Sequence, residues 1–441
     1  WPQRAPRRRA PGVPGRRNHG GRRPVCAAFW RQPMNLAPSS VVSVLVMLLL
    51  VVAARPMRAA DAAGPGPAGV ANVLAPFVES HTLAGAVTLA ATTDKVLSLD
   101  AVGWADVAAK TPLKTDAVFW IASMSKPMTA AALMMLVDEG KVKVDDPVEK
   151  YLPEFRGQML AVERDKDHVL LKAPGHPITV KEILSHTSGL PFMSPLESGK
   201  VDTLSLREAV LTYALGPLTF EPGTRYEYCN AGINTAGRII EVVSGMPYEA
   251  FMEKRIFGPL GMKDTTFWPN EEQLKRLAKS YKPDAAKTGL EETPIGQMKY
   301  PLGDRQRGPS PAGGLFSTAA DVGLFGRMVL AGGVFGGRRY LSEAAVREMT
   351  ATQTGDLLSG GQGEGGYGFG WSTSRRATAD TGTVIPGPCG HGGAHSTNLA
   401  IDPGRGLVTV FMVQHAGYPG TDGGKILPAF QQAAEALVPK K

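Results

Sequence analysis

The stretch FWIASMSKPMTAAALMMLVDEG, residues 119–140, decides how the rest of the chain is interpreted. Small and apolar residues continue from Ser123 almost without a break and end before Gly140, which predicts a helix over residues 123–139. Residues at positions i and i+3 share one face of a helix, with Cβ atoms about 5–6 Å apart. We therefore expect the Lys126 amine to reach the Ser123 hydroxyl.

A serine hydroxyl in contact with a lysine amine can carry out nucleophilic catalysis. Serine is a weak nucleophile at its ordinary pKa and must be activated by a neighbouring base. Lysine can be that base only when neutral, a form that burial or a nearby positive charge favours by lowering the pKa of the amine. The S-x-x-K pattern alone is weak evidence, because a polar helix start uses the same residues. Other motifs must decide between the two interpretations.

A second motif, Tyr228-Cys229-Asn230, lies within RYEYCNAG where a loop leads into a predicted helix. In one interpretation Asn230 caps that helix and Tyr228 only packs. In the other, the tyrosine hydroxyl transfers protons and the amide donates a hydrogen bond to a substrate carbonyl. Taken alone, the motif favours the cap; beside Ser123 and Lys126, it favours the catalytic interpretation.

A third motif, His391-Gly392-Gly393, lies within CGHGGAHSTNLAID. Glycines leading into a strand allow a ligand to approach the backbone closely, although a plain β-turn has the same composition. His391 and His395 could suggest a metal pair, but an i,i+4 spacing suits a helix rather than a strand. With no third ligand evident, the sequence disfavours a zinc site.

The three motifs, in this order and at these separations, resemble those of the serine β-lactamase and penicillin-binding protein superfamily. The resemblance is strongest to class C β-lactamases and to the carboxylesterases and D-aminopeptidases related to them, and it covers residues 70–435. Supporting stretches are ILSHTSGLP (183–191), IFGPLGMKDTTF (256–267), PAGGLFSTAADVGLF (311–325) and GYGFGW (366–371). Each piece is common, but the combination is specific.

The resemblance implies a role for each motif residue. Ser123 would be the nucleophile that accepts the acyl group, and Lys126 would be its base partner. Tyr228 would pass a proton to the leaving group and later help to activate water, while Asn230 would orient Lys126 and the substrate. His391, Gly392 and Gly393 would occupy the place of the family's K-T-G triplet. The backbone N–H groups of Ser123 and Ala394 would form the oxyanion hole.

The third motif departs from the family pattern in two ways. A lysine often stands where this chain has His391, and its charge can hold a substrate carboxylate. Histidine is only partly charged near neutral pH. Gly392 replaces the usual threonine and removes a hydroxyl. Both changes weaken the case for a dedicated cephalosporinase and favour an esterase-like or peptidase-like relative.

We therefore expect an exported serine hydrolase that forms an acyl-enzyme on Ser123 and needs no metal or organic cofactor. Its partners would be small-molecule esters, β-lactams or D-amino-acid peptides. The alternative is a dedicated β-lactamase, D-alanyl-D-alanine carboxypeptidase or D-aminopeptidase. A catalytically inactive module that binds peptidoglycan or peptides is a third hypothesis, which the presence of Ser123, Lys126 and Tyr228 disfavours.

The patterns on both sides of the motifs predict an α+β fold. Strands are expected at residues 84–90, 96–103, 396–401 and 407–413, and a last helix at 426–438. Residues 141–304 show short helical patterns and no run typical of a strand. We expect an antiparallel sheet, flanked by helices and closed by the two ends of residues 77–435. Its α/β part would comprise residues 77–140 and 305–438, with an inserted helical lobe at 141–304 and a linker at 60–76.

The basic charge of the chain is confined to its N-terminal region. The formal net charge is +8, but residues 1–59 hold eleven arginines and no Lys, Asp or Glu. Without these arginines, 37 basic residues stand against 40 acidic ones, which disfavours nucleic-acid binding. The apolar run at 41–54 is short for a membrane span and suits a signal peptide. We expect a start at Met34, a leader over residues 34–60, and a periplasmic or secreted protein without a stable membrane span.

The chain has three cysteines, Cys26, Cys229 and Cys389, which provide no disulfide framework. The sequence leaves open whether Cys229 and Cys389 form a disulfide.

Two further patterns are interpreted as structural. GQGEGG at residues 361–366 matches a nucleotide-binding glycine pattern but follows no predicted strand and opens no helix. His186 and Ser188, in SHTSG, resemble part of a catalytic triad, but no nucleophile elbow surrounds them, and Ser185 or His186 is instead expected to cap a local turn. The sequence leaves the oligomeric state open.

Overall fold

The computed structural model describes residues 69–357, 365–377 and 384–438, with the backbone alone for residues 375–377 and 384–386. The predicted start at Met34, the leader at 34–60 and the first part of the predicted linker lie outside the described residues. Within the described residues, no helix is both long enough and apolar enough to cross a membrane.

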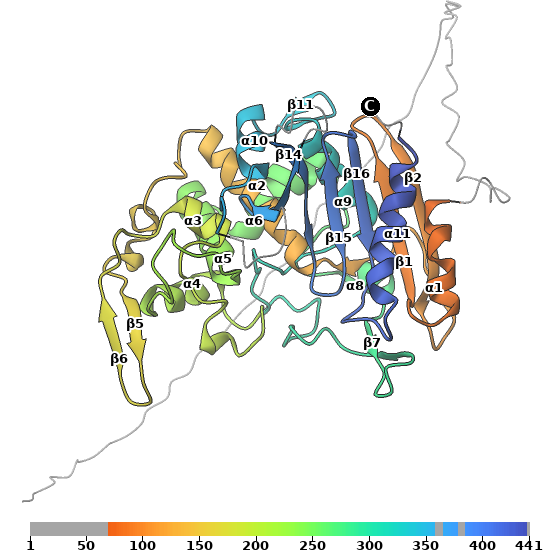
Figure 1. The fold of residues 1–441 in the computed structure, drawn as a ribbon, viewed down its shortest axis with the longest axis horizontal. Coiled ribbons are helices and arrows are strands. Elements are labelled where there is room, and N and C mark those ends of the chain that lie inside the picture. The colour runs from red at the N-terminus through yellow and green to blue at the C-terminus, as the bar shows by residue number, and fades with distance from the viewer. Residues whose placement is uncertain (1–68, 358–364, 378–383, 439–441) are drawn as a thin grey trace, which may run out of the picture. The chain divides into compact units, whose positions relative to one another are not determined.

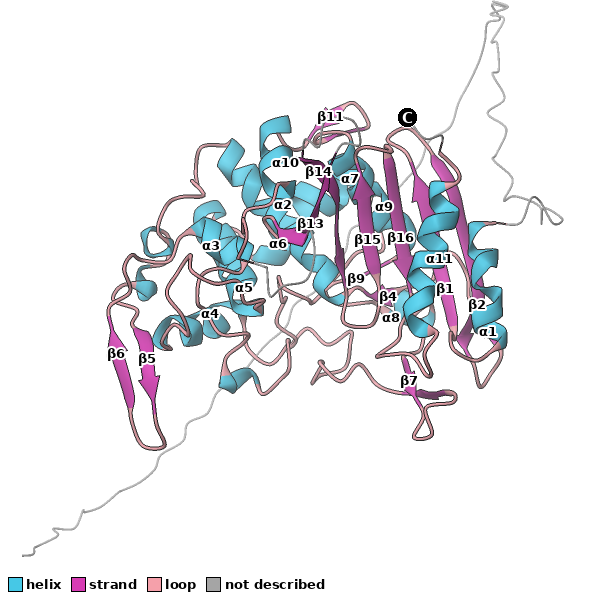
Figure 2. Cartoon of the chain, viewed as in Figure 1, coloured by secondary structure: helices cyan, strands magenta, loops and turns pink. Residues whose placement is uncertain are grey.

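An eight-stranded antiparallel sheet forms the centre of the fold, in the order β12-β13-β14-β15-β16-β1-β2-β3 (Figures 1 and 2). The strands from the N-terminal part are β1 (Gly85–Ala91), β2 (Val96–Asp106) and β3 (Thr111–Pro112). Those from the C-terminal part are β12 (Gly365–Tyr367), β13 (Ser372–Ala377), β14 (Val384–Gly392), β15 (Asn398–Asp402) and β16 (Leu407–Met412). The antiparallel pairing of β1 with β16 joins the two ends of the domain, as the sequence predicted.

Helices cover both faces of this sheet, which explains why β1 and β16 are buried along their whole length. Successive side chains of a strand point to opposite faces. Ala86 and Ala90 therefore pack in the cluster that contains α11 (Gly423–Glu435), whereas Leu89 belongs to the larger core that contains α9 (Ala319–Leu330). Figure 1 shows α11 in front of β16 and β1.

The second half of the predicted linker is structured. Residues 70–76 belong to the 3₁₀ helix η1 (Val70–Leu74) and to the start of helix α1 (Ala75–Glu79). Val70 and Leu74 are buried against α11, which is why the chain orders here despite its alanine- and proline-rich composition.

The segment between β3 and β12, which includes the predicted lobe at residues 141–304, is mostly helical. Besides α9 and the helix of the opening motif, its α-helices are α3 (Val180–Ser185), α4 (Leu206–Leu215), α5 (Asn230–Ser244), α6 (Tyr248–Met252), α7 (Gly258–Leu260), α8 (Glu271–Lys275) and, beyond the predicted lobe, α10 (Glu343–Thr350). Shorter turns are η3 (Val148–Lys150), η4 (Pro153–Phe155), η5 (Pro195–Glu197) and the π-helical η6 (Glu253–Phe257). Small strands β4 (Phe119–Trp120) and β9 (Phe316–Ser317) pair with each other, as do β10 (Val334–Phe335) and β11 (Arg338–Arg339).

Two hairpins contradict the expectation that residues 141–304 contain no strands. They are β5 (Leu160–Arg164) with β6 (Val169–Lys172), and β7 (Tyr281–Pro283) with β8 (Leu290–Glu292). The first hairpin is mostly exposed, so its strands lack the alternation of apolar and polar residues that a half-buried strand shows.

The helix of the opening motif is shorter than predicted. A 3₁₀ turn, η2 (Ala122–Met124), contains Ser123, and the α-helix α2 (Ser125–Asp138) begins two residues later. Residues 125–136 are buried on every side, which accounts for the almost uninterrupted apolar sequence. Ser123 therefore lies just before the N-terminus of a central buried helix.

Candidate active site

The backbone around Ser123 is held in a tight turn. Strand β4 enters the turn paired with β9, and the Ile121 N–H donates to the Leu315 carbonyl at 3.0 Å. Ala122 has a φ of +46°, a left-handed conformation that costs an L-residue about 1–2 kcal/mol. The Ser125 hydroxyl donates to the Ala122 carbonyl at 2.7 Å and supports this conformation. The buried Ser125 is thus a structural residue, while Ser123 is partly exposed.

Lys126 is fully buried, and its amine contacts three oxygen atoms. Nζ lies 3.1 Å from Ser123 Oγ, 2.9 Å from Asn230 Oδ1 and 2.8 Å from the Ala312 carbonyl oxygen. The amide and carbonyl oxygens can only accept, so a neutral amine donates to both and directs its lone pair towards the serine hydroxyl. Burial lowers the pKa of Lys126 to about 7. The amine can therefore accept a proton from Ser123 near neutral pH.

Tyr228 lies beside this pair and stays protonated. Its ring centroid is 4.7 Å from Lys126 Nζ. Burial raises the pKa of Tyr228 to about 12, against the opposing effect of a hydrogen bond with Ser123. At pH 7 only about one molecule in 10⁵ carries the phenolate, so Lys126 is the available base and Tyr228 is a proton donor.

Asn230 does not cap α5. The N-cap position is Cys229, without a side-chain cap bond, and Asn230 is the first helical residue. Its Oδ1 accepts from Lys126, while its backbone N–H donates to the Phe192 carbonyl at 2.8 Å. The cap interpretation is therefore wrong, and Asn230 orients the amine.

The third motif lies at the end of strand β14 and in the turn that follows it, rather than only ahead of a strand. His391 Nδ1 is 2.7 Å from the Gly392 carbonyl oxygen, so Nδ1 must carry the hydrogen. Nε2 then accepts from the Tyr367 hydroxyl at 2.9 Å. Burial, with the nearby Lys126 charge, lowers the pKa of His391 to about 3. The partial positive charge expected for His391 is therefore absent at neutral pH.

Gly393 lets this turn lie directly against the turn that contains Ser123. A Cβ on Gly393 would overlap Thr397 Oγ1 and would lie 2.5 Å from the Ile121 carbonyl oxygen. Gly392 and Ala394 are exposed, and a Cβ on Gly392 would meet nothing closer than 3.6 Å. That the N–H groups of Ser123 and Ala394 form an oxyanion hole stays a prediction.

These two adjacent glycines give a matched pair of variants. Gly393→Ala is expected to destabilise the fold by about 1–3 kcal/mol through overpacking and to lower activity by separating the two turns. Gly392→Ala, which has open space, should change the melting temperature and kcat/KM little. Thermal unfolding and ester hydrolysis of both variants test this. Equal effects would contradict the packing described here.

Other histidines, cysteines and glycines that the sequence singled out can be placed in part, while Cys26 lies outside the described residues. No group of three or more His, Cys, Asp or Glu side chains in the described residues could hold a metal ion. His395 instead contacts Ser280 Oγ and Gln414 Nε2 through Nδ1, at 3.0 Å each. Cys229 and Cys389 are both free and buried, so they do not pair. Of the glycine pattern at 361–366, the first four residues lie outside the described residues and the last two open strand β12, not a helix.

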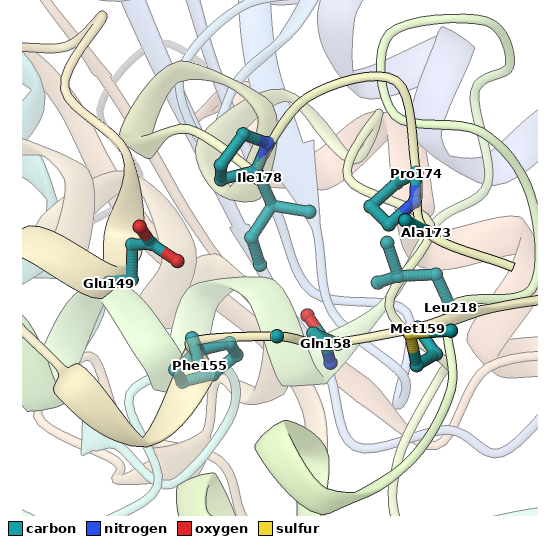
Figure 3. A pocket seen from close by; sticks show the side chains of 10 residues that line it. Glu149, Phe155, Gln158, Met159, Ala173, Pro174, Ile178 and Leu218 are labelled. Atoms are coloured by element: carbon teal, nitrogen blue, oxygen red, sulfur yellow. The ribbon is translucent and has the colours of Figure 1, made fainter.

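Sequence reasoning missed two participants around the site. The Ala312 carbonyl is the third partner of Lys126, and backbone groups leave no side-chain pattern to recognise. Ser185 or His186 was predicted only to cap a turn, and His186 does so as the C-cap of α3, but its buried ring also lies 4.5 Å from that of Tyr228. A separate cavity of about 200 Å³ lies elsewhere in the lobe, lined by Phe155, Met159, Ile178 and Leu218 among others (Figure 3). None of the motif residues lines it.

Comparison with known proteins agrees with this arrangement. The β-lactamase family model matches residues 70–433. Penicillin-binding protein 4 of Amycolatopsis lactamdurans is 32% identical over 302 residues, covering 68% of this chain and 72% of that protein. Esterase EstB of Burkholderia gladioli is 29% identical over 373 residues, covering 78% and 89%.

A solved structure shares the fold. EstCE1, a hydrolase with promiscuous acyltransferase activity, superposes with a TM-score of 0.67 at 24% identity, covering 83% of this chain and 97% of its own. The flanked antiparallel sheet with an inserted helical lobe is thus the β-lactamase/transpeptidase-like fold that the sequence predicted. Given the family match over most of the chain, this protein belongs to the β-lactamase family, whose members include esterases and penicillin-binding proteins.

Proposed function

We propose that this protein is an exported serine hydrolase that cleaves neutral carboxylic esters through an acyl-enzyme on Ser123. The observation that carries the proposal is the buried Lys126 amine, 3.1 Å from Ser123 Oγ, with a pKa of about 7. Activation of a serine requires a base whose pKa is close to the pH at which the enzyme works.

In acylation, Ser123 Oγ bonds to the ester carbonyl carbon while its proton moves to Lys126 Nζ. The carbonyl oxygen becomes an oxyanion, which the N–H groups of Ser123 and Ala394 stabilise. When the C–O bond to the alcohol breaks, Tyr228 donates its proton to the departing alkoxide. The resulting phenolate lies beside the charged Lys126 and recovers a proton from it.

In deacylation, water takes the place of the alcohol. The neutral Lys126 accepts the water proton, through the Tyr228 hydroxyl, which gives its own proton to the amine as it takes the one from water, and the water oxygen bonds to the acyl carbon. Breaking the bond to Ser123 Oγ then returns a proton to the serine and releases the carboxylic acid. No metal or organic cofactor enters either half of this cycle.

The charge and surface of the site favour neutral substrates over carboxylates. A β-lactam or a D-alanyl peptide brings a carboxylate, and the neutral His391 offers it no positive charge. Phe192, with 49% of its surface exposed, is held beside Tyr228 with ring centroids 6.4 Å apart. This aromatic rim suits an apolar acyl or alkyl group.

Export to the periplasm or the medium is the second part of the proposal. Its support is the apolar run at residues 41–54, followed by small residues where a signal peptidase could cut. N-terminal sequencing of the protein recovered from outside the cytoplasm would test it. A mature protein that retains residues 34–60 would contradict export by this leader.

Substrate preference is tested with p-nitrophenyl butyrate, a carboxylate-bearing cephalosporin and a D-alanyl-D-alanine peptide. We expect kcat/KM to be highest for the ester by about tenfold or more, because an unpaired carboxylate costs about 1–3 kcal/mol. His391→Lys, which introduces a cation, should narrow that ratio. If the wild-type protein instead turned over the cephalosporin or the peptide with the highest kcat/KM, it would be a β-lactamase or a D-peptidase rather than an esterase.

A β-lactamase or D-peptidase activity is the second candidate, favoured by the similarity to penicillin-binding protein 4. Intact-mass spectrometry with a serine-reactive phosphonate separates both activities from an inactive binding module. A hydrolase of either kind gains one adduct per chain. A chain that stays unlabelled would be a binding module with a retained site.

A further inference from the structure

His186 belongs to none of the three motifs but contacts the second motif and Tyr367, which is hydrogen-bonded to the third. It ends helix α3 with a φ of +62°, a conformation rare for residues other than glycine. The residue is fully buried. A buried imidazole in a left-handed conformation must be held in place by the groups around it.

His186 holds the backbone on both sides of Tyr228. Its carbonyl oxygen accepts from the Glu227 N–H at 2.9 Å, and its ring Nδ1 accepts from the Cys229 N–H at 3.3 Å. The segment around Tyr228 has no helical or strand hydrogen bonds of its own. These two bonds therefore fix the short loop from which the tyrosine hydroxyl reaches Ser123.

The imidazole ring also contacts two tyrosines. Its centroid is 4.5 Å from that of Tyr228 and 4.6 Å from that of Tyr367. The Tyr367 hydroxyl in turn donates to His391 in the third motif. The ring thus packs against both the second motif and the partner of the third motif, and the centroids of the two tyrosine rings also lie 6.4 Å apart.

These contacts require a neutral ring with one tautomer. Because Nδ1 accepts from an amide, the hydrogen must be on Nε2, which is buried and has no partner among the described residues. Burial, followed by the repulsion that a charged ring would meet from the protonated forms of Lys126 and His391, holds the pKa of His186 well below its ordinary value. The other groups that face the ring are Tyr226 and the Cys229 thiol.

We propose that His186 is a positioning residue that holds the Tyr228 hydroxyl at Ser123, through the Glu227 and Cys229 backbone bonds and through ring contact. The proposal rests on the proposed serine-hydrolase function and adds a residue to its machinery. It does not require His186 to touch the substrate.

The first test replaces His186 by asparagine, which tolerates a positive φ and can place an amide oxygen near the position of Nδ1. We expect His186→Asn to fold and to lose about a hundredfold in kcat, the order that a 1 Å misplacement costs, with KM changed much less. The matched control is His176→Asn, a half-exposed histidine that pairs with Glu182 in the same lobe. It should keep the wild-type kcat. An unchanged kcat in His186→Asn would overturn the proposal.

A double-mutant cycle with Tyr228→Phe separates positioning from a general loss of structure. If His186 acts through the Tyr228 hydroxyl, His186→Asn should lower kcat by less than about threefold in the Tyr228→Phe background. The reason is that the effects of two substitutions that act through the same group do not add. A full hundredfold loss in the Tyr228→Phe background would show that His186 acts independently, and would overturn the proposal.

A measurement on the wild-type protein covers the case in which the variants do not fold. Nitrogen NMR of histidine-labelled protein, with each ring assigned to its residue, should show an unprotonated Nδ1 and a protonated Nε2 for His186, unchanged from pH 5 to pH 8; His395, whose Nδ1 accepts from Gln414 Nε2, should show the same tautomer and serves as the internal reference. A His186 that carries its hydrogen on Nδ1, or that titrates in this range, would overturn the proposal. Phosphonate labelling of the same sample distinguishes a failure of the His186 proposal from a failure of the proposed hydrolase function, since an unlabelled Ser123 contradicts the hydrolase function itself.

Discussion

Replacing Ser123 by alanine is expected to lower kcat/KM for a short-chain ester on the order of 10⁴-fold or more, because the covalent step loses its nucleophile. The fold should be unaffected, since Ser123 is partly exposed and its loss leaves no cavity in the core. Intact mass after reaction with a serine-reactive phosphonate is the direct measurement. The adduct expected on the wild-type chain should be missing from Ser123→Ala.

The control for this experiment is the other serine of the same motif. Ser125→Ala removes the bonds to the Ala122 carbonyl and to the Leu315 N–H, and should cost about 1 kcal/mol in stability for each. It should still gain one phosphonate adduct per chain. An adduct that persists in Ser123→Ala, or that disappears only in Ser125→Ala, would assign the nucleophile elsewhere.

Replacing Lys126 by methionine is expected to lower kcat/KM on the order of 10³-fold, the contribution that a well-placed general base makes. Methionine matches the length of the buried side chain but cannot accept a proton, and it leaves Asn230 Oδ1 and the Ala312 carbonyl without their donor. Lys143→Met, at an exposed lysine, is the control and should retain wild-type kinetics. Wild-type rates in Lys126→Met would mean that another group activates Ser123.

The pH dependence tests the same residue without a mutation. Only the neutral amine can accept the serine proton, so kcat/KM should rise with pH through about 7 and level off above it. His391 is neutral throughout this range and should add no inflection. In Lys126→Met the residual rate should lose the rise near pH 7. A profile that falls as pH increases through 7 would assign the titrating group a role as an acid instead.

The sequence by itself determined the family fold and most of the candidate site residues. The apolar runs at residues 84–90 and 407–413 predicted strands that close the sheet, and the structure pairs β1 with β16 from Val87 with Met412 to Ala91 with Val408. The spacing of Ser123 and Lys126 was enough to predict their contact, because one helical turn fixes the distance between them. Local geometry of this kind follows directly from sequence order.

Features that depend on which residues are buried by distant parts of the chain could not be predicted from sequence order. The β5–β6 hairpin has no buried face to impose a pattern, and residues 70–76 order only because Val70 and Leu74 pack against α11. Asn230 is likewise a plausible helix cap in the sequence. It becomes a partner of the Lys126 amine, 104 residues away along the chain, only because α5 packs beside α2.

The protonation states of Lys126 and His391 depend on the tertiary structure and could not be predicted from the sequence. The pKa of Lys126 falls to about 7, and that of His391 to about 3, mainly because both groups are buried among segments that are distant in sequence. The proposed role of His186 also depends on tertiary packing, since its ring can position Tyr228 only because the Tyr228 loop and Tyr367 pack against it. A motif specifies which chemical groups are present, whereas desolvation by distant neighbours determines which of them carry a proton, and so which can act as acid or base.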